Sequence, residues 1–157
     1  MLQRTAPTIR ELLSYRLHVV ANLLSRSAEL RYRREFGVSL WEWRTVALLG
    51  AAAEPQSLNE LARAAGIDKS QMSRVVSGLA RRRIVSRAVD FNDGRGVRLT
   101  LTKSGIKLYQ GLIRSAGERN AALLACLSAK EREALESALE KLVSRARRII
   151  QQEKPLR

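Results

Sequence analysis

The chain has 157 residues with 29 basic and 15 acidic side chains, a net charge of +14, and only 4% aromatic against 45% hydrophobic residues. This length suits one domain with a real core, and so few aromatic residues leave Leu, Val, Ile and Ala to fill it, which favours helices. A single cysteine (Cys126) excludes an internal disulfide and a multi-thiol zinc site. The charge favours a polyanionic partner, either nucleic acid or an anionic membrane, and composition alone does not choose between them.

Several classes of protein are disfavoured by what the sequence lacks. No stretch of 18 apolar residues occurs, and the first residues lack the hydrophobic block of a signal peptide. One histidine (His18), with no paired carboxylates and no Ser/His/Asp set, leaves little for metal or triad chemistry. We therefore expect a cytoplasmic protein that is not an enzyme, has no cofactor or metal, and does not bind a membrane.

Capping boxes of the form S/T-x-x-E predict where most helices begin. They open apolar-periodic runs at Thr8–Glu11, Ser39–Glu42, Ser57–Glu60 and Ser128–Glu131. An Asp68–Gln71 pair and Thr102 supply two further N-caps. The predicted helices cover residues 9–34, 40–53, 58–65, 69–82, 103–126 and 129–152. With a loop at 53–56 and a hairpin at 84–102, the predicted fold class is mainly α.

The first and last predicted helices carry apolar residues on more than one side. In the first helix two neighbouring stripes run side by side, and such a width buries more than one face. We predict that these helices pack across a two-fold dimer interface. The predicted interface residues are Leu13, Leu17, Val20, Leu24, Leu139 and Leu142. The alternative is that the two helices pack on each other within one chain.

Residues 58–82, LNELARAAGIDKSQMSRVVSGLARR, have the pattern of a helix-turn-helix. Ala62 is small where two helices must approach, and Gly66 allows a left-handed turn between them. The predicted buried seam consists of Ile67, Met72, Val75 and Leu79 in the second helix, facing Leu61 and Ala65 in the first. Other helical hairpins share parts of this pattern. The strand hairpin that follows predicts a winged helix-turn-helix lobe over residues 40–102.

The opposite face of the second helix is small, polar and cationic. It carries no acid after the cap Asp68, whereas a solvated helix face usually mixes glutamate with lysine. Gln71 can read an adenine edge, serines allow close approach, and arginines can bind guanine or phosphate. The predicted DNA-binding residues of this helix are Lys69, Ser70, Gln71, Ser73, Arg74, Ser77 and Arg81. The alternatives are a merely solvated face and a non-specific architectural nucleic-acid-binding protein; Gln71 and the serines argue against the second.

The segment VSRAVDFNDGRGVRLTLT at 85–102 predicts the wing. Apolar residues alternate with polar ones from Val97 to Leu101, as in a half-buried strand, and two glycines suit the turn before them. Arg95 between these glycines is placed to enter a narrow minor groove, with Asp93 orienting its guanidinium. The alternative is a solvated turn.

These motifs resemble the MarR family of bacterial transcription regulators over nearly the whole chain. WEWRTVALL at 41–49 is similar to that family's second helix, SLNELARAAGIDKSQMSRVVSGLARRRIVSR to its helix-turn-helix, and DFNDGRGVRLTLTKSG to its wing. In the wing, the family's Asp-x-x-Asp-x-Arg pattern is Asp90, Asp93 and Arg95.

The resemblance implies a single MarR-like domain over residues 1–157, in which the helices at 9–34 and 103–152 of two copies intertwine. Such a homodimer binds double-stranded DNA at a pseudo-palindromic operator, and associates with the bacterial nucleoid when bound. The resemblance also implies a small aromatic or anionic effector that releases the DNA. Arg16, His18 and Arg44 are the candidates for holding it, although packing or the dimer interface is the alternative role for His18.

The chain departs from the family's pattern at two positions. Arg83 stands where glycine is usual between the recognition helix and the wing, and a left-handed backbone there costs arginine roughly 1 kcal/mol over glycine. Phe91 stands where proline is frequent, which predicts a looser wing tip. Peroxide-sensing members carry a cysteine near the N-terminus, and this chain has none there; we expect Cys126 to be a small buried residue. Trp43 matches the family's core position.

Overall fold

The computed structural model describes residues 8–89 and 96–153. Its helices are α1 (Leu13–Phe36), α2 (Leu40–Ala51), α3 (Leu58–Ala65), α4 (Lys69–Arg81), α5 (Lys103–Leu124) and α6 (Ala129–Gln152), and its strands are β1 (Gln56–Ser57), β2 (Val85–Val89) and β3 (Val97–Leu101). The chain divides into two compact units, one ending at Arg114 and the other starting at Ser115. The boundary falls within α5. The expectation of a single domain over 1–157 stays a prediction.

The predicted caps form and set the starts of the helices. At Ser57 the backbone N–H donates to Glu60 Oε2 (2.7 Å), and the Glu60 N–H donates to Ser57 Oγ (3.2 Å). Reciprocal boxes of the same kind open α2 at Ser39 and α6 at Ser128. Thr102 Oγ1 accepts from the Gly105 N–H at 3.0 Å and so caps α5. Each cap satisfies backbone donors that the first helical turn leaves unpaired.

Two predicted boundaries were wrong. The helix predicted from residue 9 is interrupted, since Ile9–Glu11 forms a 3-10 turn, Leu12 is extended (φ −68°, ψ 129°) and α1 starts at Leu13. The capping box at Thr8 therefore closes a separate short turn. The loop predicted at 53–56 ends in β1, where Gln56 pairs with Leu99 of β3. A two-residue strand carries no alternation of its own, and its pairing comes from a partner far along the chain.

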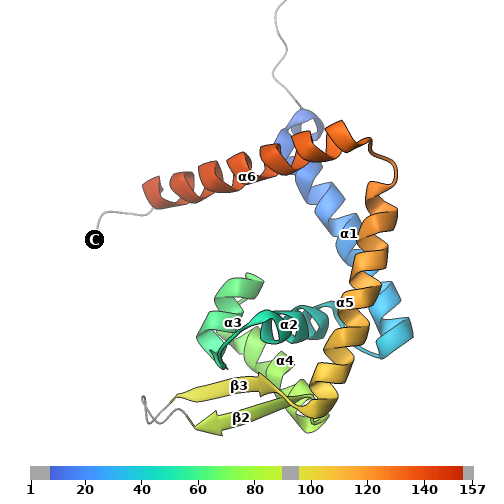
Figure 1. Cartoon of the computed structure of the whole chain (residues 1–157). Coiled ribbons are helices and arrows are strands. Elements are labelled where there is room, and N and C mark those ends of the chain that lie inside the picture. Colours follow the sequence, from blue (N-terminus) through green and yellow to red (C-terminus); the bar gives the residue numbers. More distant parts are fainter. Residues whose placement is uncertain (1–7, 90–95, 154–157) are drawn as a thin grey trace, which may run out of the picture. The chain divides into compact units, whose positions relative to one another are not determined.

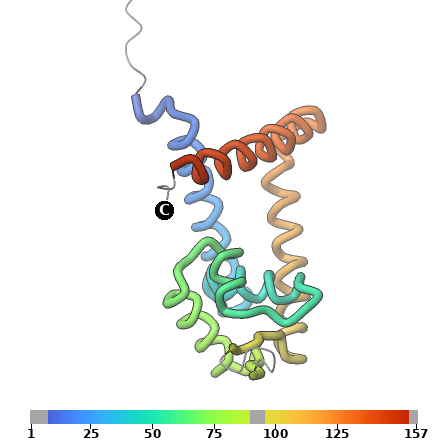
Figure 2. The backbone as a smooth tube through the Cα atoms, turned by 90° about the vertical axis from the view of Figure 1, so that its left-hand side faces the viewer, coloured from blue at the N-terminus to red at the C-terminus, as the bar shows by residue number. Residues whose placement is uncertain are grey.

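The winged helix-turn-helix lobe has its own core in the first unit. Figure 1 shows α2, α3 and α4 gathered beside the β2–β3 hairpin, and Figure 2 shows the same group from the side. Buried side chains come from each of these elements: Thr45, Val46, Leu49, Leu61, Ala62, Met72, Val76, Leu79, Val85 and Leu99. Three residues of the predicted seam, Ile67, Val75 and Ala65, are only half-buried. Val76 rather than Val75 is buried because it lies one turn beyond Met72, and Ala62 is buried where Ala65 is only half-buried.

The three strands form an antiparallel sheet in the order β1-β3-β2. The hairpin register runs from Val85 opposite Leu101 to Val89 opposite Val97. Val85 and Leu99 turn inward and are 3% and 2% exposed. These two residues anchor the wing on the lobe, so β2 and β3 leave it from a fixed base.

The junction between α4 and the wing is closely packed. Arg83 has φ 57°, so the left-handed backbone anticipated at this position is present, and it is occupied by arginine instead of glycine. The Ile84 N–H donates to Leu79 O (2.9 Å) and Thr102 Oγ1 donates to Arg83 O (2.6 Å). A Cβ on Gly105 would come within 2.2 Å of Ile84 O, so only glycine fits there. These contacts fix the direction in which the wing leaves the recognition helix.

Helix α6, in the second unit, has no buried residue in the single chain. Its apolar face is left uncovered, with Leu135, Leu139, Leu142, Val143, Ile149 and Ile150 between 38% and 59% exposed. Cys126, between α5 and α6, is exposed as well, so the prediction of a buried cysteine was wrong. The helix before it ends at Leu124, two residues short of the predicted end, and Cys126 lies in the turn that follows instead of on an apolar helix face.

Candidate nucleic-acid interface

Four of the predicted DNA-binding residues are exposed on the surface of α4. The helix starts at Asp68, whose Oδ1 accepts from the Gln71 N–H at 2.8 Å. The exposed four are Lys69, Ser70, Arg74 and Arg81. Ser70, Arg74 and Arg81 lie opposite the buried seam of Met72, Val76 and Leu79, because the spacing of 3.6 residues per turn separates the two sets. Lys69 is exposed because it is the first residue of the helix.

The remaining predicted residues of α4 lie on its flanks and are half-buried: Gln71, Ser73 and Ser77. Ser77 Oγ accepts a hydrogen bond from Arg87 Nη2 of β2 at 2.7 Å. Arg87 was not predicted as a site residue. The sequence signal for it is weak, because the alternation in β2 is poor and the bond crosses between two elements.

A shallow hollow of about 520 Å³ runs beside the start of α4. It is lined by Leu58, Lys69, Ser70, Ser73 and Arg74. Lysine, arginine and two serines around an open hollow form a surface on which a phosphate can be held by charge and by hydroxyl donors. The hollow therefore brings together four of the predicted residues, Lys69, Ser70, Ser73 and Arg74.

The basic residues on this surface are uncompensated. Within residues 8–89 and 96–153, no carboxylate lies within ion-pair distance of Lys69, Arg74 or Arg81. By contrast Arg82, next in the chain, pairs with Glu42 of α2 at 3.1 Å. The basic surface of α4 is thus available to a polyanion, whereas Arg82 beside it forms an ion pair within the protein.

Asp93 and Arg95 of the predicted wing tip lie outside the described residues. The strands on either side are paired up to Val89 and Val97. The minor-groove role assigned to Arg95 stays a prediction.

The three candidate effector residues are not brought together in one described contact. Arg44 Nη2 donates to Ser25 Oγ of α1 (3.4 Å), and its guanidinium lies 4.8 Å from the centroid of the Trp41 ring. His18 Nε2 lies 2.8 Å from Asn22 Nδ2 on the exposed side of α1. Arg44 also lines a hollow of about 340 Å³ with Trp43 and Ala64, which neither Arg16 nor His18 lines.

Most of the predicted dimer residues are exposed in the single chain. The exposed fractions are 53% for Leu13, 40% for Leu17, 52% for Val20, 41% for Leu139 and 38% for Leu142, and Leu24 is half-buried. Further apolar residues continue these faces, among them Leu23 at 64% and Ile150 at 59%.

Neither a metal-binding cluster nor a membrane-spanning helix occurs in the part of the chain that the structure describes. No group of three or more His, Cys, Asp or Glu side chains is arranged to hold a metal ion. None of the helices found there combines the length and the apolar character needed to span a bilayer.

A helix-turn-helix with a basic exposed second helix, followed by an anchored strand hairpin, defines a winged helix DNA-binding protein. The sequence model of the MarR family matches residues 36–96, which run from the end of α1 into the wing. Among curated proteins no sequence matches the chain significantly.

Solved structures extend the likeness over most of the chain. A MarR/EmrR family transcriptional regulator from Acinetobacter sp. ADP1 is 26% identical with a TM-score of 0.81, covering 90% of this chain and 99% of the other. The S. aureus MepR–DNA complex is 25% identical with a TM-score of 0.77, covering 85% and 97%. A mutant of E. coli MarR, 22% identical over 88% and 99% with a TM-score of 0.73, shares the fold. Residues 36–96 thus match the MarR family of transcription regulators, and the chain is similar over most of its length to a solved member of that family.

Proposed function

We propose that the protein is a ligand-responsive repressor that binds a pseudo-palindromic operator as a homodimer. The observation that carries this proposal is the basic face of α4, where Lys69, Ser70, Arg74 and Arg81 are exposed and none of the three cations is paired with a carboxylate among the described residues. Its similarity to the S. aureus protein solved in a complex with DNA supports DNA as the polyanion. Such a regulator acts where the chromosome lies, in the cytoplasm.

Sequence-specific binding is supported by the mixture of groups on and beside this face. Pure phosphate binders need only cations, whereas Gln71 supplies an amide that can pair with both edge atoms of adenine. Ser70 and Ser73 are small enough for the helix to approach base edges. Selection of DNA from a random pool should therefore yield an inverted repeat whose half-sites are about one helical turn, roughly 34–36 Å, apart.

Competition between the selected DNA and random DNA at fixed salt decides between this function and an architectural one. A specific regulator should bind its operator roughly 10³-fold or more tightly than random DNA. Equal affinity for both would overturn the proposal and leave a non-specific nucleic-acid-binding protein.

The homodimer is supported by the uncovered apolar faces of α1 and α6. Replacing Leu17 and Leu24 with glutamate would place unpaired charges in the interface, so we expect a monomer or an aggregate by light scattering. Arg26→Glu, at an exposed polar position of α1, is the matched control and should leave the mass unchanged. A folded dimer of unchanged mass in the double variant would show that the interface lies elsewhere.

The wing is proposed to contact a minor groove through Arg95. Arg95→Ala should weaken operator binding by roughly 1–3 kcal/mol and reduce the salt dependence by up to about one unit. It should also remove any preference for A·T pairs beside the half-site, because a narrow A·T-rich groove favours an inserted arginine. Arg74→Ala is the control that should leave the flanking preference intact. Equal affinity of the Arg95 variant and the parent for every flank would contradict this role.

Ligand response is proposed to act through the region of α1 and α2 around Arg44, with Arg16 and His18 as further candidates. An effector weakens DNA binding only if it binds the DNA-incompetent state more tightly. Aromatic acids such as benzoate, titrated at high concentration, should lower operator affinity and shift the melting temperature of the free protein. No change in either quantity would remove the support for this site.

A further inference from the structure

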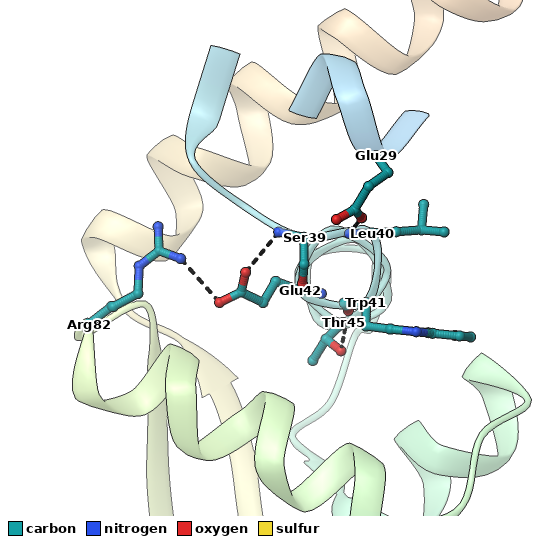
Figure 3. Close-up of polar contacts among 7 residues, drawn as sticks. All are labelled: Glu29, Ser39, Leu40, Trp41, Glu42, Thr45 and Arg82. Carbon is teal, nitrogen blue, oxygen red and sulfur yellow. Dashed lines mark hydrogen bonds and ion pairs between the residues drawn. The ribbon is translucent and has the colours of Figure 1, made fainter. Parts of the chain in front are cut away.

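An ion pair joins the C-terminal end of the recognition helix to α2. Arg82 Nη1 lies 3.1 Å from Glu42 Oε1, although the two residues are 40 positions apart in the chain (Figure 3). The side chain of Glu42 is 18% exposed and that of Arg82 is 41% exposed. The pair is therefore partly shielded from water.

The carboxylate of Glu42 is held in place by its own helix. Its Oε2 accepts from the Ser39 N–H at 2.8 Å, and the Glu42 N–H donates to Ser39 Oγ at 3.2 Å. Oε1 is left for Arg82, and it lies 3.9 Å from where a Cβ on Gly78 would stand, one turn before Arg82 on α4. With one oxygen fixed by the cap, the position of the other is set by α2.

Each charge also suits the end of the helix on which it sits. Glu42 lies in the first turn of α2, where the helix dipole is positive, and Arg82 is the C-cap of α4, where it is negative. The interaction of each charge with the dipole of its own helix is therefore favourable as well, and it adds to the attraction between the two residues.

A second contact holds α4 to α2 near the other end. Thr45 Oγ1 donates to Trp41 O at 2.8 Å and lies 3.6 Å from the buried Sδ of Met72. Met72 precedes Arg82 by ten residues, or about 15 Å along the helix. One core contact alone permits a helix to tilt or rotate about it, whereas two contacts that far apart fix its direction.

Helix α2 is in turn attached to α1 at the same end. The Leu40 N–H donates to Glu29 Oε2 of α1, and Glu29 Oε1 accepts from Arg33 Nε at 2.6 Å. The first turn of α2 thus receives two carboxylates, Glu29 from α1 and its own Glu42 (Figure 3). The turn of α2 that carries Glu42, the partner of Arg82, is therefore itself held to α1.

We propose that the Glu42–Arg82 pair sets the orientation of the recognition helix on DNA, and that Arg82 is a positioning residue rather than a phosphate contact. Its neighbour Arg81 is exposed on the basic face without a carboxylate partner among the described residues, so we expect Arg81 to contact the DNA backbone. This inference rests on the proposed function, since it concerns how the same helix meets its operator.

The test compares Arg82→Gln with Arg81→Gln in operator titrations over a range of salt concentrations. Arg82→Gln should lower operator affinity roughly fivefold at about 0.15 M salt, the size of effect that neighbouring residues exert on one another. The slope of log affinity against log salt should stay unchanged, because an arginine already paired with glutamate releases no counterion. Arg81→Gln should reduce that slope by about one. A reduced slope for Arg82→Gln would overturn the inference.

A double-mutant cycle supplies the second readout. Glu42→Gln keeps an oxygen for the Ser39 cap but removes the charge, so it should lose about as much affinity as Arg82→Gln. The double variant should lose no more than either single one, because both break the same pair. Melting of each DNA-free variant checks folding, and Glu42→Gln alone carries the test if the Arg82 variant does not fold.

The outcomes separate this inference from the function on which it rests. Unchanged affinity in Glu42→Gln, or losses that simply multiply in the double variant, overturn the positioning role while specific binding by the parent still stands. Absence of specific binding by the parent chain overturns both.

Discussion

Helices α4 and α6 are both amphipathic and rich in basic residues, but they differ in how many of their residues are buried within one chain. Helix α4 has 13 residues and buries three of them, whereas α6 has 24 residues and buries none. The inward-facing apolar residues of α4 meet α2, α3 or the wing. The apolar residues of α6 are exposed instead, for example Leu139 at 41% and Ile150 at 59%. The apolar face of α4 is therefore buried within one chain, whereas the exposed apolar face of α6 is typical of a surface that binds a partner.

The sharpest test of this difference replaces one leucine-sized residue in each helix with alanine. Met72→Ala opens a cavity in a finished core and should lower the free energy of unfolding by roughly 2–5 kcal/mol, as measured by urea denaturation. Leu139→Ala should leave the lobe folded and instead raise the dissociation constant of the dimer about tenfold or more, as measured by sedimentation. A Met72 variant within about 0.5 kcal/mol of the parent would show that α4 is not held by its seam.

A smaller effect is expected at the end of α4, where the backbone of Arg83 is left-handed with φ 57°. Arg83→Gly should raise the free energy of unfolding by about 1 kcal/mol, because glycine adopts this conformation without the Cβ clash. Gly66, at φ 71° in the turn before α4, is the converse control, and Gly66→Ala should lower stability by a similar amount. If Arg83→Gly instead lowered the free energy of unfolding, contacts of the arginine side chain would outweigh the cost of its left-handed backbone.

The smallest expected effect compares the caps of the lobe and of α6. Hydrogen bonds from Ser57, with Arg98 nearby, lower the pKa of the Glu60 carboxyl below its ordinary value of 4.5. Hydrogen bonds from Ser128 likewise lower the pKa of Glu131. A lowered pKa contributes stability above pH 4.5 that is lost as the pH falls through the folded-state value.

Glu60→Gln and Glu131→Gln keep a capping oxygen but cannot titrate. Unfolding midpoints measured from about pH 5.5 down to about pH 3 should therefore fall less steeply in each variant than in the parent. If the unfolding midpoint fell as steeply with pH in both variants as in the parent, other carboxylates would be responsible for the loss of stability in acid.

The parts of this molecule that the sequence predicted are those decided within a few residues. A capping box joins positions three apart, so Ser39, Ser57 and Ser128 could be identified from the sequence alone. The basic face of α4 followed from helical periodicity in the same way. Both kinds of signal are local, which is why these helix starts, and the exposure of Lys69, Ser70, Arg74 and Arg81, were predicted correctly, whereas Gln71, Ser73 and Ser77 are half-buried.

The parts that were missed depend on contacts between distant segments. The β1 strand exists because Gln56 meets Leu99, and the Ser77–Arg87 hydrogen bond needs the wing to fold back on α4. Glu42 was identified as a cap, but its second partner Arg82 lies 40 residues away. The choice of Val76 over Val75 was likewise made by packing, since both fit an amphipathic pattern.

The exposed position of Cys126 has a practical consequence for studying this protein. It is the only cysteine of the chain. A maleimide spin label or fluorophore would therefore attach at one known site per chain without any prior mutagenesis. In a dimer the two labels would form a symmetric pair between α5 and α6 of each copy, and their separation could be followed while operator or effector is added.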